Sequence, residues 1–260
     1  MKTVIMAGGF GTRLRPLTQS LPKPMVPMAN RPMLNHIVDL LKHHGLTDFV
    51  SLLYFQPEQI KNFFRDGSDF GVKMRYMLAE SDLGTAGSVK NAESHLLGER
   101  VLVISGDVLT NFDLSAAIKF HEERGAAATM ILTRLENPLS YGVVITEPDG
   151  AITRFLEKPT WGEVFSDTIN TGIYILEPKV FERIPRGEPF DFSQNLFPGM
   201  LADKEKLYGY IAPGYWRDVG NLSEYMKAHL DILSGKIDLW GSYQHLKHGD
   251  AEIWFNKNVR

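Results

Sequence analysis

The sequence predicts an α/β protein with a parallel sheet flanked by helices. Short apolar runs of strand length alternate with helical patterns up to about residue 126, and the first run is Lys2 to Ala7. A strand, a helix and a second strand normally form a right-handed parallel unit, so this alternation indicates a parallel sheet. The 260 residues, 43 % of them hydrophobic and 23 % charged, are enough for one large domain or two small ones.

The first half of the chain contains the parallel strands. We expect them over residues 2–7, 49–54, 72–78 and 101–105. A helix follows Pro32, a residue suited to a first helical turn, and ends near Gly45; another covers Pro57 to Arg65, and a third begins near Thr85. Ligands bind beyond the carboxyl ends of strands in an open α/β sheet. The loops after the first, third and fourth strands are therefore the candidate site.

The pattern changes after about residue 126, where β-like runs follow one another with little helix between them. They cover residues 129–134, 143–146, 152–157 and 168–176. We interpret them as antiparallel or mixed additions that build a lid beside the parallel half. Helical segments follow over residues 192–202 and 222–233. We expect residues 1–235 to form the main domain and residues 236–260 a tail.

Composition excludes several classes of protein. No apolar run reaches the roughly 18 residues of a membrane span, and the run before Gly8 is too short for a signal peptide. The chain has no cysteine, so it has no disulfide and no thiolate metal site. A net charge of −3 without a long basic run does not suggest nucleic acid. We expect a cytoplasmic protein without membrane or nucleic-acid partners.

The loop after the first strand has the composition of a phosphate-binding loop. Gly8, Gly9 and Gly11 let the backbone approach a phosphate closely and direct N–H groups at it. The loop is not a P-loop. That motif ends in Gly-Lys-Ser/Thr, whereas here Thr12 and Arg13 follow Gly11. Arg13 is a planar, permanent cation suited to bidentate phosphate contact. A plain glycine-rich turn with a surface arginine is the alternative.

Further charged residues stand at informative places. Pro22 and Pro24 hold the backbone around Lys23 extended and stiff, so this lysine can be aimed at a ligand phosphate at little entropic cost. Asp107 follows Gly106 at the carboxyl end of the fourth strand, where a carboxylate suits Mg²⁺. The alternatives are a solvated loop lysine and a helix-capping aspartate.

The glycine loop and the lysine segment together form a long motif. Gly-Gly-x-Gly-Thr-Arg-Leu-x-Pro-Leu-Thr, followed by Pro-Lys-Pro-Met, resembles the signature of the sugar-phosphate nucleotidyltransferases. The resemblance continues to about residue 230. It implies a Rossmann-like, GT-A-like mixed sheet with a β-rich sugar-binding lid. It also implies transfer of a nucleoside monophosphate from an NTP to a sugar 1-phosphate, by Mg²⁺-dependent in-line attack on the α-phosphate that releases pyrophosphate.

The resemblance assigns residues to each part of such a site. For the nucleotide it implies Gly8, Gly9, Gly11, Thr12, Arg13, Gly84, Thr85 and Ala86. For the sugar phosphate it implies Gly142, Glu157, Lys158, Asn170 and Thr171. The motif Trp216-Arg217-Asp218-Val219-Gly220 resembles the family's second metal motif, so Asp107 and Asp218 are the expected Mg²⁺ ligands. Arg13, Lys23 and Asp107 are the expected catalytic residues.

The base and the sugar are less sharply indicated. Relatives that use UTP or dTTP commonly carry a glutamine five residues before Gly84, where this chain has Ala79 and then Glu80. Guanine presents adjacent N–H donors that a carboxylate matches, which adds Glu80 to the nucleotide-binding residues and favours GTP. Residues 155–172 most resemble the mannose-1-phosphate guanylyltransferase-like branch. UTP or dTTP with glucose 1-phosphate is the alternative.

Other classes of protein fit the sequence less well. A regulatory subunit that binds a nucleotide-sugar without catalysis would be expected to lose a metal carboxylate or the lysine. A glycosyltransferase usually shows Asp-x-Asp, which Asp107-Val108-Leu109 lacks, and a nicotinamide dehydrogenase needs a third glycine where Leu14 stands. The oligomeric state, including a homo-oligomer, stays open.

The end of the chain changes character after residue 235. Residues 250–260 resemble the first coil of a left-handed β-helix, in which Ile or Val recurs regularly. Such a coil is stable when it is stacked on others. We therefore expect a chain cut from a longer parent, and a short enzyme with an irregular tail is the alternative.

Overall fold

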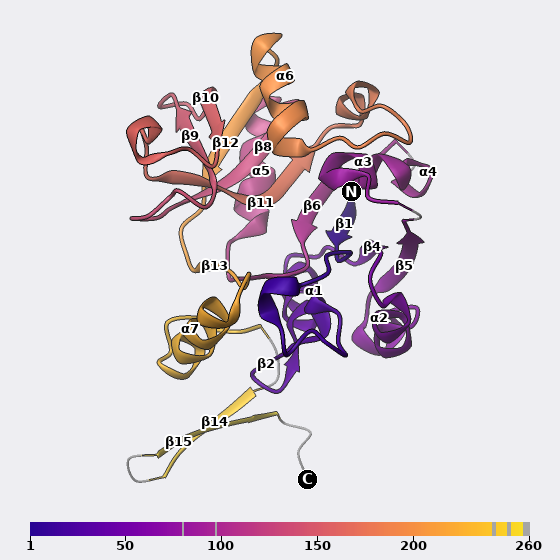
Figure 1. Ribbon diagram of the computed structural model, residues 1–260, viewed down its shortest axis with the longest axis vertical. Coiled ribbons are helices and arrows are strands. Elements are labelled where there is room, and N and C mark those ends of the chain that lie inside the picture. Colours follow the sequence, from indigo (N-terminus) through magenta and orange to yellow (C-terminus); the bar gives the residue numbers. More distant parts are fainter. Residues whose placement is uncertain (80, 97, 241–242, 249–250, 257–260) are drawn as a thin grey trace.

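The computed structural model of the protein describes residues 1–79, 81–96, 98–240, 243–248 and 251–256. Within these residues, nine strands form one mixed sheet with helices packed around it (Figure 1). The predicted α/β class with a mixed, helix-flanked sheet is therefore confirmed. No helix in the described part of the chain is both long and apolar enough to cross a bilayer.

The parallel half of the sheet follows the predicted order of strands and helices. Its strands are β1 (Lys2–Met6), β4 (Asp48–Leu53), β5 (Lys73–Leu78) and β6 (Val101–Ser105). They are arranged β6-β1-β4-β5, with Val4 beside Val50 and Val103. The connecting helices are α1 (Met33–His43), α2 (Pro57–Phe64), α3 (Gly84–Asn91) and α4 (Glu93–Leu96). The strand β5 begins one residue later than predicted.

Side chains on both faces of the parallel strands are buried. Ile5 belongs to a core cluster with Leu34 and Leu41 of α1, whereas its neighbour Val4 packs in a cluster with Ala86 and Phe197. Successive side chains of a strand point to opposite faces, so both faces of the sheet are covered. This explains the continuous apolar runs that indicated these strands.

The β-rich half extends the same sheet. Its strands are β8 (Ala128–Arg134), β9 (Gly142–Thr146), β10 (Ile152–Glu157), β11 (Thr168–Leu176) and β12 (Leu207–Ile211). The strand β11 runs antiparallel to β6, β8 and β9, and β12 runs parallel to β8. The additions are therefore antiparallel and mixed, as predicted, and β11 joins them directly to the parallel strands.

Two short antiparallel strand pairs and three further helices complete the described domain. They are β2 (Pro27–Met28), β3 (Arg31–Pro32), β7 (Val108–Thr110), β13 (Trp216–Asp218), α5 (Leu114–Arg124), α6 (Phe197–Ala202) and α7 (Leu222–Leu233). The antiparallel pair β7 and β13 places Asp218 opposite Val108. The helix predicted over 192–202 begins instead with a π-helical turn over Phe192–Leu196.

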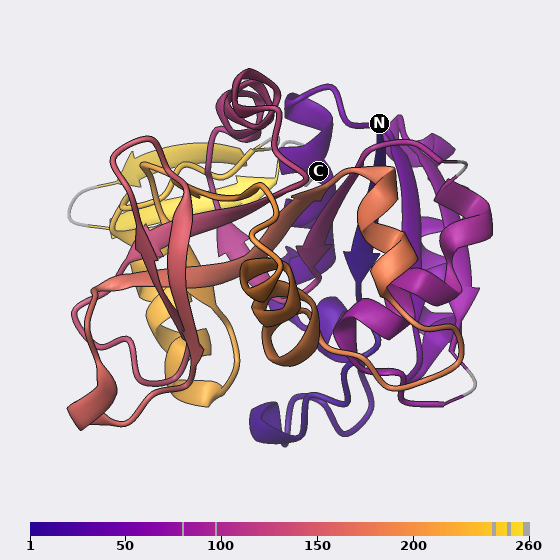
Figure 2. The same cartoon turned by 90° about the horizontal axis from the view of Figure 1, so that it is seen from above.

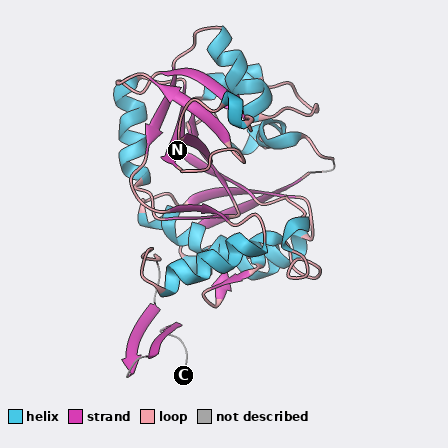
Figure 3. Cartoon of the chain, turned by 60° about the vertical axis from the view of Figure 1, so that its left-hand side comes forward, coloured by secondary structure: helices cyan, strands magenta, loops and turns pink. Residues whose placement is uncertain are grey.

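The C-terminal segment leaves the domain near α7 (Figure 3). Its strands β14 (Tyr243–His248) and β15 (Ala251–Asn256) pair antiparallel as a hairpin. Residues 250 and 257–260, which belong to the predicted β-helix coil, lie outside the described residues. The assignment of this segment to a β-helix stays a prediction.

Candidate active site

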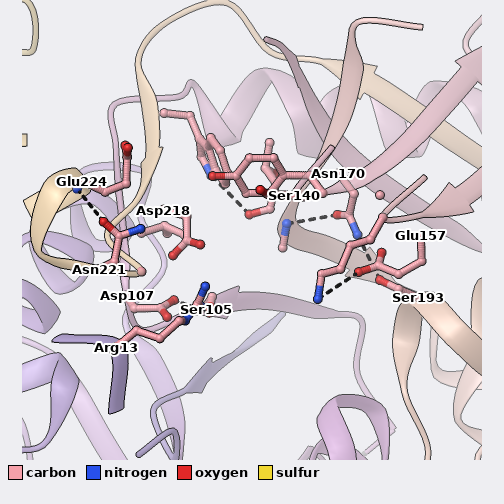
Figure 4. Close-up of a pocket in the computed structure, with 18 residues that line it drawn as sticks. Arg13, Ser105, Asp107, Ser140, Glu157, Asn170, Ser193, Asp218, Asn221 and Glu224 are labelled. Carbon is pink, nitrogen blue, oxygen red and sulfur yellow. Dashed lines mark hydrogen bonds and ion pairs between the residues drawn. The ribbon is translucent and has the colours of Figure 1, made fainter. Parts of the chain in front are cut away.

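Adjoining cavities lie at the carboxyl ends of the parallel strands and share Ser105 and Asp107 in their walls. The first has a volume of about 360 Å³ and is named here the Glu157 cavity (Figure 4). It is lined by Arg13, Ser105, Asp107, Val108, Ser140, Tyr141, Gly142, Glu157, Lys158, Asn170, Thr171, Gly172, Ser193, Trp216, Asp218, Gly220, Asn221 and Glu224. The second, the Gly8 cavity, has a volume of about 310 Å³. It is lined by Met6, Gly8, Gly9, Phe10, Leu52, Leu53, Tyr54, Met77, Ala79, Ser81, Asp82, Gly84, Thr85, Ser88, Asn91, Ser105 and Asp107.

The loop after β1 contributes to both cavities. Gly8 and Gly9 line the Gly8 cavity, and the ring of Phe10, which is 51 % exposed, stands at its wall beside Tyr54. Arg13 lies in the wall of the Glu157 cavity instead. The loop can thus present backbone N–H groups to one ligand and a guanidinium group to the other.

Gly11 fixes the position of Lys23. Its φ of +62° is in the left-handed region, and a Cβ there would lie 3.0 Å from Cβ of Lys23 and 3.0 Å from Cγ2 of Thr18. A side chain at this position would therefore disturb the backbone and push on Lys23. Thr12, another expected nucleotide contact, is exposed to solvent.

Lys23 lies between the two carboxylates that the sequence suggested as a pair. Its ammonium group donates a hydrogen bond to Asp107 and lies 3.7 Å from Oδ1 of Asp218. The lysine is only 7 % exposed, so little water screens these contacts. The hydroxyl of Ser105 donates to Oδ1 of Asp107 over 2.6 Å and fixes the orientation of that carboxylate. Because β7 follows Asp107 and pairs with β13, the fold brings these distant acids together.

One ammonium group cannot neutralise two carboxylates. Burial alone would raise the pKa of Asp107, but the charge of Lys23 and hydrogen bonds from Lys23 and Ser105 outweigh it and lower that pKa. Burial and the neighbouring charge of Asp107 raise the pKa of Asp218, although Lys23 and Arg13 act against them. The charge of Asp218 is therefore less fully compensated than that of Asp107, and a cation bound beside it would stabilise both carboxylates.

Arg13 stands near the same acids. A Cβ on Gly220 would lie 3.3 Å from Nη2 of Arg13 and 3.1 Å from Oδ2 of Asp218, so a side chain there would press on both groups. In the described part of the chain, Arg13 makes no ion pair of its own, and its side chain faces the cavity (Figure 4). Its charge is thus available to an anionic ligand.

The opposite wall of the Glu157 cavity is built from β9 and β10. Gly142 pairs with Glu157, and a Cβ on Gly142 would lie 2.8 Å from Oε2 of that glutamate and 2.7 Å from the ring of Phe155. Burial raises the pKa of Glu157, although the charge of Lys158 acts against it. The Nζ atom of Lys158 lies 3.7 Å from Oε1 of Glu157 and is exposed at the mouth of the cavity.

A bulge in β11 turns Asn170 towards the cavity. The register of β11 against β8 shifts between Asn170 and Ile173, and bulges commonly redirect side chains beside binding sites. The amide nitrogen of Asn170 donates to the hydroxyl of Tyr174 over 2.9 Å and to that of Ser193 over 3.3 Å. Its oxygen accepts from the backbone N–H of Gly172. Asn170 is therefore held rigidly in the wall.

Thr171 also lines the cavity, but its hydroxyl is used by the sheet. That hydroxyl donates to the carbonyl of Ile131 over 2.6 Å, and the carbonyl of Thr171 accepts from the indole of Trp216 over 3.2 Å. The ring of Trp216 packs edge-on against Tyr141, another lining residue. Thr171 thus supports the wall and does not offer a free hydroxyl.

The start of α3 closes the Gly8 cavity. Gly84 and Thr85 line it, whereas Ala86 is fully buried in the core behind. Ala79 lies in the wall, where its small side chain leaves space. Glu80, the expected guanine contact, lies outside the described residues.

Both the sequence and the fold of the chain match those of known proteins. A family model described as nucleotidyl transferase matches residues 2–235. The chain belongs to the nucleotidyl transferase family. The crystal structure of a Bacillus anthracis protein assigned as a glucose-1-phosphate thymidylyltransferase, in complex with sucrose, matches this chain with a TM-score of 0.82. The match has 26 % identity and covers 92 % of this chain and 97 % of the other.

Curated relatives of the chain are named for different substrates. It is 37 % identical to the UTP–glucose-1-phosphate uridylyltransferase of Synechocystis, over 91 % of this chain and 64 % of the relative. It is 36 % identical to the mannose-1-phosphate guanylyltransferase of Mycobacterium tuberculosis, over 89 % of this chain and 64 % of the relative. The chain thus spans a little under two-thirds of the length of these relatives.

The sequence did not predict several residues that line the Glu157 cavity. Asn221 and Glu224 line the Glu157 cavity at the start of α7, where Oδ1 of Asn221 accepts from the backbone N–H of Glu224 over 2.9 Å. The Asn-x-x-Glu spacing is a helix-capping signal and could have located this helix start beside the Trp216 motif. Ser140 and Ser193 carry no comparable signal, because isolated serines occur in many loops.

Proposed function

We propose that this protein transfers a nucleoside monophosphate from an NTP to a sugar 1-phosphate. The observation that carries the proposal is the pair of adjoining cavities that share Asp107, with Lys23 and Asp218 at their junction. Each cavity has the size of a small polar ligand, and both lie beyond the carboxyl ends of the strands. Ligands in the two cavities would meet at this charged junction.

The NTP is assigned to the Gly8 cavity. Gly8 and Gly9 offer backbone N–H groups for phosphates, and Met77 and Tyr54 offer apolar surface for a base. The sugar 1-phosphate is assigned to the Glu157 cavity, where Glu157 and Asn170 can bind hydroxyl groups. Lys158 and Arg13 supply positive charge for its phosphate.

The reaction needs no nucleophile from the protein. A sugar-phosphate oxygen is ionised at neutral pH and forms a bond to the α-phosphorus, while the bond to the β-phosphate bridging oxygen breaks and pyrophosphate leaves with its electrons. The protein has to position two anions and neutralise their charge. Lys23 bonds Asp107, which both cavities share, and Arg13 lines the Glu157 cavity, so both cations suit that task.

The residues fit a magnesium ion. Asp107 and Asp218 offer oxygen ligands, and a cation bound beside them would stabilise both carboxylates. No cluster of three or more histidine or acidic side chains able to hold a metal occurs in the described ranges, so phosphate oxygens and water would complete the coordination. When bound there, Mg²⁺ would supply charge neutralisation at the reacting phosphates.

GTP and mannose 1-phosphate are the proposed substrates, and UTP or dTTP with glucose 1-phosphate is the alternative. Mannose-1-phosphate guanylyltransferases are among the curated relatives, and so is a UTP–glucose-1-phosphate uridylyltransferase. Ala79 in the wall of the Gly8 cavity replaces the glutamine common in relatives that use UTP or dTTP. The catalytic unit is proposed to be residues 1–235, which include the cavities.

Pyrophosphate release tests the proposal. We would measure it with Mg²⁺ for GTP, UTP, dTTP, ATP and CTP, each with mannose 1-phosphate and with glucose 1-phosphate. A maximum for GTP with mannose 1-phosphate is expected, and a maximum for UTP or dTTP with glucose 1-phosphate would favour the alternative. Folded protein that is inactive with every pair would contradict the reaction and favour a nucleotide-sugar-binding regulatory subunit.

A further inference from the structure

A short stretch of chain before α6 reaches from one cavity to the other. Residues 188–193, named here the bridge segment, pass beside α3 (Figures 1 and 2) and end at Ser193, which lines the Glu157 cavity. Asp191 is absent from the described lining of both cavities. The segment therefore runs between the two proposed ligand positions. Asp191 itself lies behind the cavity walls and would contact neither ligand.

The backbone of the bridge segment is locked to the start of α3. The N–H of Phe190 donates to the carbonyl of Leu83 over 3.0 Å, and the N–H of Gly87 donates to the carbonyl of Phe190 over 2.9 Å. A Cβ on Gly84 would lie 2.9 Å from that same carbonyl oxygen, and one on Gly87 would lie 2.8 Å from the oxygen of Glu188. With no space for even a methyl group, α3 and the bridge segment must move together.

A side-chain contact strengthens this link on the nucleotide side. The hydroxyl of Thr85 donates to Oδ2 of Asp191 over 2.7 Å and accepts from the backbone N–H of Phe192 over 2.9 Å. Thr85 lines the Gly8 cavity, so a ligand there would touch the residue that holds Asp191. The threonine hydroxyl itself is already used.

The other carboxylate oxygen of Asp191 acts on the sugar side. Oδ1 accepts from the backbone N–H groups of Ser193, over 2.7 Å, and Gln194, over 3.1 Å. The hydroxyl of Ser193 accepts from the amide of Asn170 over 3.3 Å and lies close enough to Glu157 to act towards a lower pKa of that carboxyl (Figure 4). Asp191 thus holds Thr85 with one oxygen and positions, with the other, the serine that lies beside both hydroxyl-binding residues of the wall.

We infer that Asp191 is a positioning residue that couples the two cavities, so that an NTP bound at Thr85 raises the affinity of the Glu157 cavity for a sugar 1-phosphate. The inference rests on the proposed function. Binding of the nucleotide fixes α3 and with it the bridge segment, and the sugar-phosphate wall is then already ordered when its ligand arrives. Coupling of two binding equilibria is reciprocal, so the sugar 1-phosphate raises the NTP affinity by the same factor.

Calorimetry on the full chain measures this coupling. Mannose 1-phosphate and glucose 1-phosphate would be titrated with and without saturating α,β-methylene GTP or UTP, whose α,β bridge cannot be cleaved. The wild type is expected to bind its sugar 1-phosphate about fivefold or more tightly with the analogue present. Equal affinity in both titrations would overturn the inference, while pyrophosphate release would keep the proposed function.

Substitutions then test the path through Asp191. Thr85→Val keeps the shape of the side chain and loses only its hydroxyl, and Asp191→Ala removes both contacts. Each is expected to bring the affinity ratio close to one. Asp113→Asn is the matched control, because Asp113 caps α5 through the N–H of Ala116 and lies away from both cavities. A Thr85→Val variant that folds and keeps the wild-type ratio would refute the path.

The two proposals fail in different ways. A wild type that releases pyrophosphate but shows no coupling contradicts the role of Asp191 alone. A wild type that binds neither analogue nor sugar 1-phosphate contradicts the proposed function and the coupling together. If Asp191→Ala does not fold, as judged by its thermal transition, the Thr85→Val measurement still decides the inference.

Discussion

At the scale of single residues, Lys23 is the centre of the candidate site. Its ammonium group bonds Asp107 and lies 3.7 Å from Asp218, and it reaches this place because Gly11 leaves room for it. The site is therefore organised before any ligand binds. A positioned charge in a place with little water acts more strongly on a reacting phosphate than a mobile surface lysine does.

Replacing Lys23 by methionine keeps most of the side-chain volume and removes the charge. We expect kcat for nucleotidyl transfer to fall by about 10²-fold to 10³-fold, the range found when one stabilising group is lost. The control is Lys119→Met, because Lys119 is an exposed lysine of α5. Turnover of Lys23→Met within threefold of the wild type would rule out the proposed role.

The same substitution should change metal binding in the absence of substrates. The ammonium of Lys23 competes with any cation for Asp107 and Asp218, so its removal should strengthen Mn²⁺ binding measured by calorimetry. The Lys119→Met control should bind Mn²⁺ as the wild type does. Weaker binding in the Lys23→Met protein would show that the two carboxylates do not form the cation site.

A buried histidine gives the fold a pH dependence. His36 bonds the carbonyl of Met28, and burial lowers its pKa from 6.5 to about 4. Between pH 6.5 and pH 4 the unfolded chain takes up a proton at His36 that the folded chain does not, so stability falls as the pH falls. The loss attributable to this residue is on the order of 3 kcal/mol.

Urea unfolding at pH 7.5 and at pH 5 measures this effect. The free energy of unfolding should be lower at pH 5, and His36→Gln should reduce the difference because glutamine does not titrate. His95→Gln on α4 is the control and should leave the difference unchanged. A His36→Gln protein with the full wild-type pH dependence would assign the effect to other groups.

At the scale of elements, the paired strands β9 and β10 form the wall that holds Glu157. Gly142 is required in this pair because the ring of Phe155 and the carboxylate of Glu157 fill the space a side chain would need. The bulge of β11 beside them turns Asn170 to the same cavity. The wall is thus a property of strand register and not of a flexible loop.

Gly142→Ala should displace Glu157 and leave the Gly8 cavity intact. A new Cβ would lie 2.7 Å from the ring of Phe155, so neighbours must shift. We expect the KM for sugar 1-phosphate to rise about tenfold, which is about 1.4 kcal/mol, with a smaller change in the KM for the NTP. Gly162→Ala is the matched control, because a Cβ added at Gly162 would have no atom within 4 Å other than those of its chain neighbours. An equal rise in both KM values would contradict the assignment of the two cavities.

The sequence predicted the elements that form locally and missed those that depend on distant pairing. Continuous apolar runs located β1 and β6, since both of their faces are buried. The short strands β7 and β13 were missed because each has three residues and exists only through the other. The closeness of Asp107 and Asp218 was inferred from resemblance alone, for the same reason. Thr171, an expected sugar-phosphate residue, donates its hydroxyl to the carbonyl of Ile131, a partner that only the folded sheet reveals.

At the scale of the whole molecule, the side chains that the structure describes, up to residue 240, build the core clusters and both cavities. Ile237 is 3 % exposed and packs with Val219, Ala228 and Ile232 behind α7. Trp240 stacks on His43 at the end of α1, with ring centroids 3.6 Å apart. The chain is therefore tied to the domain up to residue 240.

Truncations should separate this anchored stretch from the hairpin. A chain of residues 1–240 is expected to keep its turnover within about twofold and its Tm within a few degrees. A chain of residues 1–235 loses Ile237 and Trp240 and should melt several degrees lower, because a buried aliphatic side chain contributes about 2 kcal/mol or more. Loss of turnover in the 1–240 chain would show that the hairpin supports the site.

The strand β11 has a consequence for how such proteins diversify. Because it pairs with β6 on the nucleotide side and with β8 and β9 on the sugar side, one continuous sheet supports both cavities. The spacing between the two cavities is inherited with the strands, whereas many of the residues proposed to contact the base and the sugar lie at or near strand ends, as Glu157 does. Under the proposed function, point changes at these positions can alter substrate choice while the spacing of the two cavities is preserved. Relatives 36 % and 37 % identical to this chain, one named for guanylyl transfer and the other for uridylyl transfer, are the outcome that such an arrangement permits.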